Sequence, residues 1–199
     1  MRGGHFVHCL GALGPAHVLF DQHALDRDLS WLVAIDGAAV LGSFALACMT
    51  PFAALAAASA LTLSRRAGIM AVLGAWMLNQ IIGFGFLGFP TDPMTILRGV
   101  AIAVSMLAGF GVAHAVRGST GTLSLARMVA AIAGSFVAYE VVTYLTAMVL
   151  GGTENFTPAI VWMLARNDAM WFTGLMALYL ALTAGAPSVF GRRPQLRLA

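Results

Sequence analysis

The chain has 199 residues, of which 60% are hydrophobic and only 10% are charged, and its mean hydropathy is +0.87. Soluble globular domains carry about a quarter charged residues, so this composition excludes an ordinary soluble domain and indicates an integral membrane protein. All 11 basic residues are arginines, and the formal net charge of +3 does not point to nucleic acid. Because a spanning helix needs about 20 apolar residues, the length allows one membrane domain and no sizeable soluble domain beside it.

Residues 1–30 form a poor first span. They contain four of the five histidines, Pro15 and three aspartates. We therefore expect this segment to be either an N-terminal arm or a weak first helix. The histidines are His5, His8, His17 and His23. Their irregular spacing does not support a metal site, and we expect none.

The next apolar run, residues 31–63, is too long for one straight crossing. Its 33 residues would make a helix of about 50 Å at 1.5 Å per residue, whereas the hydrocarbon layer is about 30 Å thick. Pro51 lies near its middle and removes a backbone donor there. The run is therefore either one kinked, tilted helix or two helices packed closely together.

Four further apolar runs follow, separated by polar residues. They cover residues 67–89, 96–116, 123–150 and 168–186, and the last is preceded by an amphipathic stretch, residues 157–166, which we expect to lie in the membrane interface. The sequence thus predicts an all-α, polytopic bundle of five or six transmembrane helices over residues 31–186, followed by a cytoplasmic basic tail, residues 187–199.

The arginines predict the orientation of this bundle, because cytoplasmic loops of membrane proteins are enriched in basic residues. Placing the basic tail in the cytoplasm and alternating backwards puts Arg117 and Arg127 there, and also Arg65 and Arg66. The loops at residues 90–95 and 151–168 then face outward.

The stretch AWMLNQIIGFGFLGFP, residues 75–90, combines amides with glycines inside an apolar run. Asn79 and Gln80 lie about halfway across the predicted span, and Gly83, Gly85 and Gly88 follow in the outer half. Glycines weaken a helix but also let neighbouring helices pack closely. Two interpretations stay open: helix packing, or a loosened backbone that lines an outward-open cavity.

Glu140 is an acid inside the predicted span of residues 123–150, about two thirds of the way toward its outer end. An ionised acid at such depth costs about 2.5 to 3.5 kcal/mol on insertion scales, and intramembrane ionisable residues are functional-site hypotheses by default. It either pairs with Arg98 or belongs to a ligand site; Asp36 is a weaker candidate. The predicted ligand-binding set is Trp76, Asn79, Gln80, Arg98, Tyr139, Glu140, Tyr144 and Arg166.

Small residues repeat every fourth position in the inner half of residues 31–63, as in Ala53 and Ala57. Such spacing favours close helix contact, either within the chain or with another membrane protein. Hydrolase, metalloprotease and P-loop motifs do not occur in the sequence. We therefore predict no catalytic residue, no cofactor and no ATPase activity in the chain itself.

These features together resemble the substrate-binding S-components of energy-coupling-factor vitamin transporters. The resemblance rests on the short spans, the TPFAAL segment with Ala53 and Ala57, the arginines at the cytoplasmic helix ends and the outer polar residues. Asn79-Gln80, Gly83-Phe84 and Phe89-Pro90 are similar to the cobalamin-uptake branch. The resemblance implies a vitamin pocket that faces outward from a bacterial inner membrane. It also implies that Ala53 and Ala57 dock on a transmembrane coupling protein driven by ATPases.

Two functions from different classes are compatible with these observations. The first is a substrate-binding component for uptake of a vitamin-like small molecule, with cobalamin as one candidate. The alternative is a membrane-embedded enzyme or assembly factor that acts on a lipid-like substrate, with Glu140 as a general acid or base.

Overall fold

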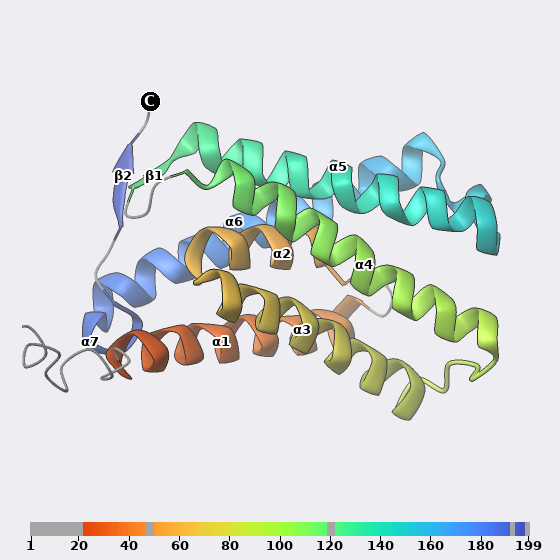
Figure 1. The fold of residues 1–199 in the computed structure, drawn as a ribbon, viewed down its shortest axis with the longest axis horizontal. Helices are drawn as coiled ribbons and strands as arrows, with labels where there is room; N and C mark the ends of the chain where they lie inside the picture. The colour runs from red at the N-terminus through yellow and green to blue at the C-terminus, as the bar shows by residue number, and fades with distance from the viewer. Residues whose placement is uncertain (1–21, 47–49, 119–121, 192–193, 198–199) are drawn as a thin grey trace, which may run out of the picture.

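The computed structural model describes residues 22–46, 50–118, 122–191 and 194–197, and these form an almost entirely helical bundle (Figure 1). The elements in chain order are α1 (Gln22–Leu46), α2 (Phe52–Thr62), α3 (Arg65–Gly85), α4 (Pro93–Val116), β1 (Thr122–Ser124), α5 (Leu125–Leu150), the 3₁₀ turn η2 (Thr153–Asn155), α6 (Pro158–Gly185), α7 (Pro187–Phe190) and β2 (Gln195–Arg197). The two short strands pair in parallel, with Leu123 opposite Leu196.

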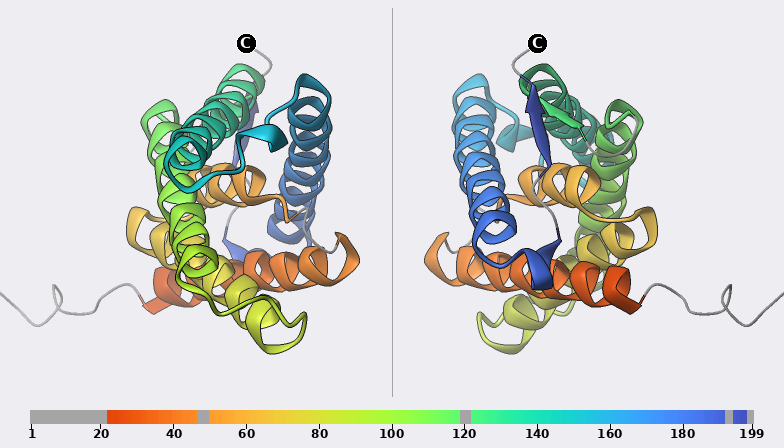
Figure 2. Two further views of the ribbon diagram at one scale, coloured as in Figure 1. Left: turned by 90° about the vertical axis from the view of Figure 1, so that its right-hand side faces the viewer. Right: turned by 90° about the vertical axis from the view of Figure 1, so that its left-hand side faces the viewer.

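Five long helices surround one short helix. Helices α1, α3, α4, α5 and α6 run roughly along the long axis of the molecule (Figure 1). The end views show α2 in the middle of the bundle, between the pair α4 and α5 on one side and α6 on the other (Figure 2). All residues of α2 from Phe52 to Leu61 are buried. The chain therefore places an 11-residue helix, too short to cross a membrane, at the centre of its fold.

Within the described part of the chain, three helices, α3, α4 and α5, are long and apolar enough to cross a membrane. Large apolar side chains cover their outward faces, such as Met70 on α3, Val104 on α4 and Val149 on α5, which is 82% exposed. Contiguous apolar surface of this kind is typical of contact with lipid. Helical fold and membrane class are thus as predicted. Helices α1 and α6 are also long, with 25 and 28 residues, but are not among these three spans.

The long run at residues 31–63 is two helices, not one. Helix α1 begins at Gln22, so the predicted boundary between residues 30 and 31 falls inside it. The chain then reverses, and α2 follows Pro51. Helix α2 packs more extensively against α3, α4, α5 and α6 than against α1. The prediction of two separate helices is therefore correct, but the prediction that they pack mainly against each other is wrong. The alanines of α2 pack against the other helices of the bundle instead.

The amphipathic stretch at residues 157–166 is not a separate interfacial element. It forms the first part of α6, which continues through residue 168 without a break to Gly185. The Thr157 side chain accepts a hydrogen bond from the Ile160 N–H at the start of the helix, as expected for an N-cap residue. The prediction divided this helix at Asp168, because that acid interrupts the apolar run.

The glycines of residues 83–88 end helix α3. The N–H of Leu87 donates to the Ile82 carbonyl, and that of Phe89 donates to the Gly83 carbonyl. Gly88 has φ +69°, the left-handed region that glycine favours. A Cβ on Gly83 would lie 2.5 Å from the Phe89 ring, so the ring can pack here only because residue 83 has no side chain. These glycines and phenylalanines therefore build a helix end rather than a cavity wall.

Candidate binding cavity

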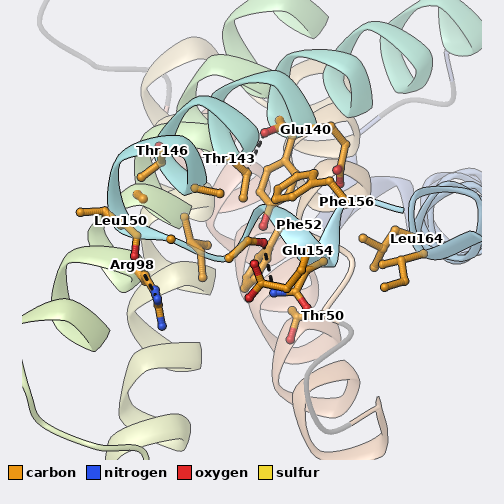
Figure 3. A pocket seen from close by; sticks show the side chains of 18 of the residues that line it. Thr50, Phe52, Arg98, Glu140, Thr143, Thr146, Leu150, Glu154, Phe156 and Leu164 are labelled. Atoms are coloured by element: carbon orange, nitrogen blue, oxygen red, sulfur yellow. Dashed lines mark hydrogen bonds between the residues drawn. The ribbon is translucent and has the colours of Figure 1, made fainter. Parts of the chain in front are cut away.

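A cavity of about 400 Å³ lies in one half of the bundle. Its walls come from the N-terminal end of α2, from α4, α5 and α6, and from the loop between α5 and α6 that contains η2 (Figure 3). The volume falls in the range of pockets that bind drug-sized molecules. Because the lining includes the loop residues Gly151, Gly152, Glu154, Asn155 and Phe156, the cavity reaches the end of the bundle where α5 and α6 are joined.

Asp168 connects α6 to the start of α2 beside this cavity. It is only 7% exposed, and its Oδ1 accepts a hydrogen bond of 2.7 Å from the Ala54 backbone N–H. The first N–H groups of a helix have no partner within the helix, and water is scarce at the centre of a bundle. Asp168 therefore supplies a buried hydrogen-bond acceptor where α2 needs one.

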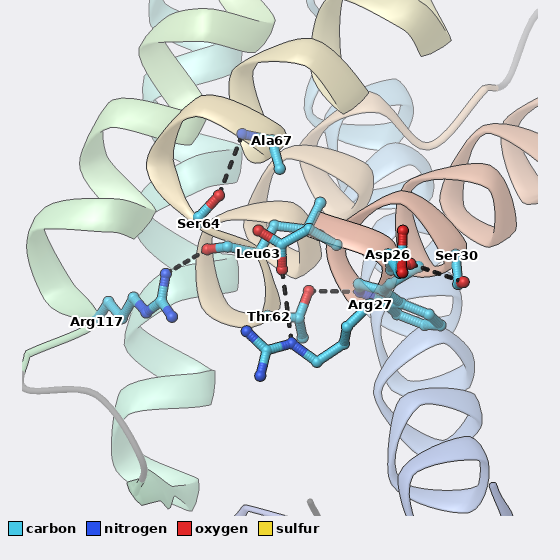
Figure 4. A network of polar contacts seen from close by, with 10 residues as sticks. Asp26, Arg27, Ser30, Thr62, Leu63, Ser64, Ala67 and Arg117 are labelled. Carbon is cyan, nitrogen blue, oxygen red and sulfur yellow. Dashed lines mark hydrogen bonds and ion pairs between the residues drawn. The ribbon is translucent and has the colours of Figure 1, made fainter. Parts of the chain in front are cut away.

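Arg117 provides hydrogen-bond donors at the other end of α2. Its Nη1 donates to the Ala60 carbonyl at 3.2 Å and to the Leu63 carbonyl (Figure 4). Trp31 of α1 reinforces this end, because its Nε1 donates to Thr62 Oγ1 at 2.6 Å. An acid at the N-terminus and a cation at the C-terminus both complement the helix dipole. Helix α2 is thus held at its two ends by side chains from neighbouring helices.

Close contact between α4 and α5 brings a third polar link to α2. A Cβ on Gly109 would lie 2.7 Å from Ser135 Oγ and 3.0 Å from the Ser135 carbonyl, so α5 approaches the backbone of α4 at this point. Ser135 Oγ donates to the Ala53 carbonyl at 3.0 Å, and this bond is buried. The floor of the cavity is therefore fixed by hydrogen bonds from both α5 and α6.

Glu140 lines the cavity from α5, but the predicted pair with Arg98 does not form. Arg98 Nη2 donates instead to the Leu150 carbonyl at 3.0 Å (Figure 3). Among the described residues, the ion pair found is that between Arg27 and Asp28, at 3.8 Å. Glu140 is half-buried and has no cation beside it in the described part of the chain.

Hydroxyl and aromatic groups complete the lining. Thr143 Oγ1 lies 2.9 Å from Ser105 Oγ and 2.8 Å from the Tyr139 carbonyl. The rings of Phe52 and Tyr139 lie 6.2 Å apart, and Phe156 closes the side toward η2. The cavity thus combines apolar ring surface with a small number of polar groups, as small-molecule sites usually do.

Of the eight predicted ligand-binding residues, Arg98, Tyr139 and Glu140 line the cavity. Three others, all on α3, lie elsewhere: Trp76 Nε1 donates to the Gly99 carbonyl at 2.7 Å, Asn79 accepts from Thr50 at 3.2 Å, and Gln80 packs against Gly99. These contacts join α3 to its neighbours, so the interpretation of the amides as cavity lining is wrong for this cavity.

Tyr144 and Arg166 also lie outside the lining. Tyr144 is 43% exposed and meets Phe156 edge to face at 5.1 Å between ring centroids. Arg166 is exposed on α6, two residues before Asp168. Positions two apart on a helix point about 200° from each other, so only one of them faces inward. The predicted gathering of all these polar groups in one hollow is therefore only partly realised.

The cavity also contains residues that the candidate set omitted, chiefly Thr50, Glu154 and Asp168. Asp168 carried a signal, since it is an acid within an apolar sequence, but it was interpreted as the start of a helix. Thr50 and Glu154 are ordinary loop residues in the sequence, and only the reversal of the chain brings them here.

The alanines expected to dock on a partner are inside the molecule. Ala53 and Ala57 are both 0% exposed, because α2 is enclosed by the other helices. The prediction of a docking surface is therefore wrong for these residues. Their spacing serves packing within the chain, the other alternative that the sequence allowed.

No family model, curated protein or solved structure matches this chain. The fold and cavity by themselves define a class: a helical membrane protein in which a short buried helix forms the floor of a mainly apolar cavity that contains a few polar groups. Within the described residues, no group of three or more histidine, cysteine, aspartate or glutamate side chains is placed to hold a metal ion.

Proposed function

We propose that the protein binds a vitamin-like small molecule from the outer side of a bacterial inner membrane and takes part in its uptake. The observation that carries this proposal is the cavity of about 400 Å³ at one end of a lipid-facing bundle. Carboxylates and hydroxyls are costly among apolar helices, and a ligand-binding role accounts for their presence around a space that a solute can enter.

The proposed topology has five full-length crossings, formed by α1, α3, α4, α5 and α6, and the shorter α2 runs opposite to α1 and α3 and returns the chain through the bundle (Figure 1). The helix ends that carry Arg65, Arg117 and Arg127 lie at the end of the bundle opposite the α5–α6 loop (Figure 1). Under the positive-inside rule this arginine-rich end faces the cytoplasm. The cavity then faces outward.

The size of the cavity limits the ligand, and the lack of a nucleotide-binding motif limits the source of energy for uptake. The cavity suits a drug-sized molecule; cobalamin is larger, so only part of it would enter. The sequence contains no nucleotide-binding motif, so energy for uptake comes from an ion gradient or from a transmembrane coupling protein with ATPases. Such a partner would bind a surface other than Ala53 and Ala57.

The direct test is thermal unfolding of the purified protein in detergent with a vitamin panel that includes cobalamin. A ligand that binds only the folded state raises stability by RT ln(1 + [L]/Kd), and we expect one panel member to raise Tm with saturation. As a control, replacing Thr143 with Tyr should fill the cavity and abolish the shift. If no vitamin and no other small solute changes Tm at saturating concentration, the uptake proposal fails.

The topology has an independent test. A reporter fused after Thr120 should signal cytoplasm, and one inserted at Thr153 should signal periplasm. Reversed signals would place the cavity on the cytoplasmic side and contradict uptake from outside.

A further inference from the structure

We propose that the cavity selects a small organic cation; this inference rests on the proposed binding function and narrows its ligand. The first observation is the balance of charge on the walls. Glu140, Glu154 and Asp168 contribute carboxylates, and among the described lining residues Arg98 is the one basic side chain. The cavity is therefore acidic before any ligand enters it.

Arg98 does not neutralise these acids. Its guanidinium is engaged with the Leu150 carbonyl, at the C-terminal end of α5, and the side chain is exposed. Its position complements the negative end of that helix. The positive charge thus stays at the rim of the cavity.

The carboxylates of Asp168 and Glu140 differ in the positive groups that lie beside them. Asp168 accepts from the Ala54 N–H and meets the positive end of α2, equivalent to about half an elementary charge. Glu140 has no such helix end and no cation among the described residues. Glu140 is half-buried, and even partial burial of a carboxylate is unfavourable when no partner compensates it. A ligand with a positive charge beside Glu140 supplies the missing partner.

The aromatic walls indicate an organic cation rather than a bare metal ion. Phe52, Tyr139 and Phe156 line the same space as the acids. Cations are attracted to the faces of aromatic rings, and a quaternary or protonated amine also fills volume against them. A divalent metal requires several ligands in one coordination shell, and the described residues offer no such group.

The test compares ligands that differ in charge but not in shape. Choline and its neutral carbon isostere 3,3-dimethylbutan-1-ol are titrated by calorimetry into the full-length protein in detergent, together with thiamine and spermidine as larger cations. We expect at least one cation to bind with saturation. If choline binds, the neutral isostere should bind at least tenfold more weakly. This comparison uses the unmodified chain, so it does not depend on any variant folding.

Two variants then test whether the carboxylate of Glu140 binds the cation. Glu140→Gln keeps the size of the side chain, and we expect it to weaken binding of the cation at least tenfold. Asp92→Asn is the matched control, because it also removes one negative charge but lies outside the cavity. It should leave affinity within twofold of wild type.

The outcomes separate this inference from the proposed function. Binding of a neutral or anionic vitamin, with no response to Glu140→Gln, overturns the preference for cations and leaves the uptake role intact. Failure of all three cations to bind also overturns it. If neither these cations nor any vitamin binds, both proposals fail.

Discussion

Asp168 and Arg117 bind opposite ends of the same buried helix. The carboxylate of Asp168 accepts from the Ala54 N–H at 2.7 Å, and the guanidinium of Arg117 donates to the carbonyls of Ala60 and Leu63. Each charge complements the helix end that it meets. An isolated helix of 11 residues is marginal in water, so α2 depends on these neighbours as well as on packing.

Replacing Asp168 with Ala should destabilise the protein by roughly 1 to 3 kcal/mol, the usual cost of leaving a buried donor unsatisfied. Asp168→Asn keeps an acceptor oxygen and should cost less. Chemical unfolding in detergent, followed by circular dichroism, measures both. Equal stability of wild type and Asp168→Ala would show that the cap on α2 contributes nothing.

Arg117→Ala should cost a similar amount, about 1.5 to 3 kcal/mol for hydrogen bonds to a charged donor. Arg66→Ala provides the control, because Arg66 is an exposed arginine near the same end of the bundle. The same unfolding assay should show a change of less than about 0.5 kcal/mol for the control. Matching losses in the two variants would attribute the effect to net charge instead of to α2.

Gly109→Ala tests the close approach of α4 and α5. The new methyl group would meet the Ser135 carbonyl at 3.0 Å, which is backbone and cannot rotate away, so we expect a loss of about 1 to 3 kcal/mol from overpacking. Gly111 lies on the same helix with open space around it. Gly111→Ala should therefore be neutral or stabilising, by up to about 1 kcal/mol. Melting temperatures in one detergent compare the two.

Asp92 provides a prediction on pH. Hydrogen bonds from the Thr95 side chain and backbone, and from the Met94 N–H, lower the pKa of the Asp92 carboxyl below its ordinary value. A lowered pKa in the folded state means that this cap contributes stability above the unfolded pKa of about 3.9 and loses it as pH falls through the folded value.

Stability of the wild type relative to Asp92→Asn should therefore decline below about pH 4. Asparagine caps a helix about as well as aspartate but does not titrate. Melting curves between neutral and acidic pH measure the difference. A constant difference across that range would contradict a titrating cap at Asp92.

Hydropathy was sufficient to predict the membrane class and the helices α3, α4 and α5, because long apolar runs bounded by polar residues leave few alternatives. The start of α5, for example, is at Leu125 where residue 123 was expected. The acids were also correctly identified as unusual, and Glu140 does line the cavity. Local sequence determines these features.

The arrangement around α2 was not predictable in the same way. Alanines spaced four apart favour close contact but do not say with which helix. Packing within the chain and docking on a partner were therefore both open for Ala53 and Ala57, and the family resemblance favoured docking although both residues pack within the chain. Asp168 was predicted to start a helix, and its contact with α2 was missed because its partner, the Ala54 N–H, is 114 residues away in sequence. Long-range contacts of this kind leave no periodic pattern.

If the protein takes up a solute as proposed, the buried position of α2 limits the path of that solute. A solute that enters beside the α5–α6 loop meets Phe52 and the start of α2, and the helix beyond is enclosed on all sides as far as Leu61. Helix α2 therefore lies between the cavity and the arginine-rich end of the bundle. Under the proposed uptake role, a solute could reach that end only if α2 moved, and such a movement would break the contacts of Asp168 and Arg117 together.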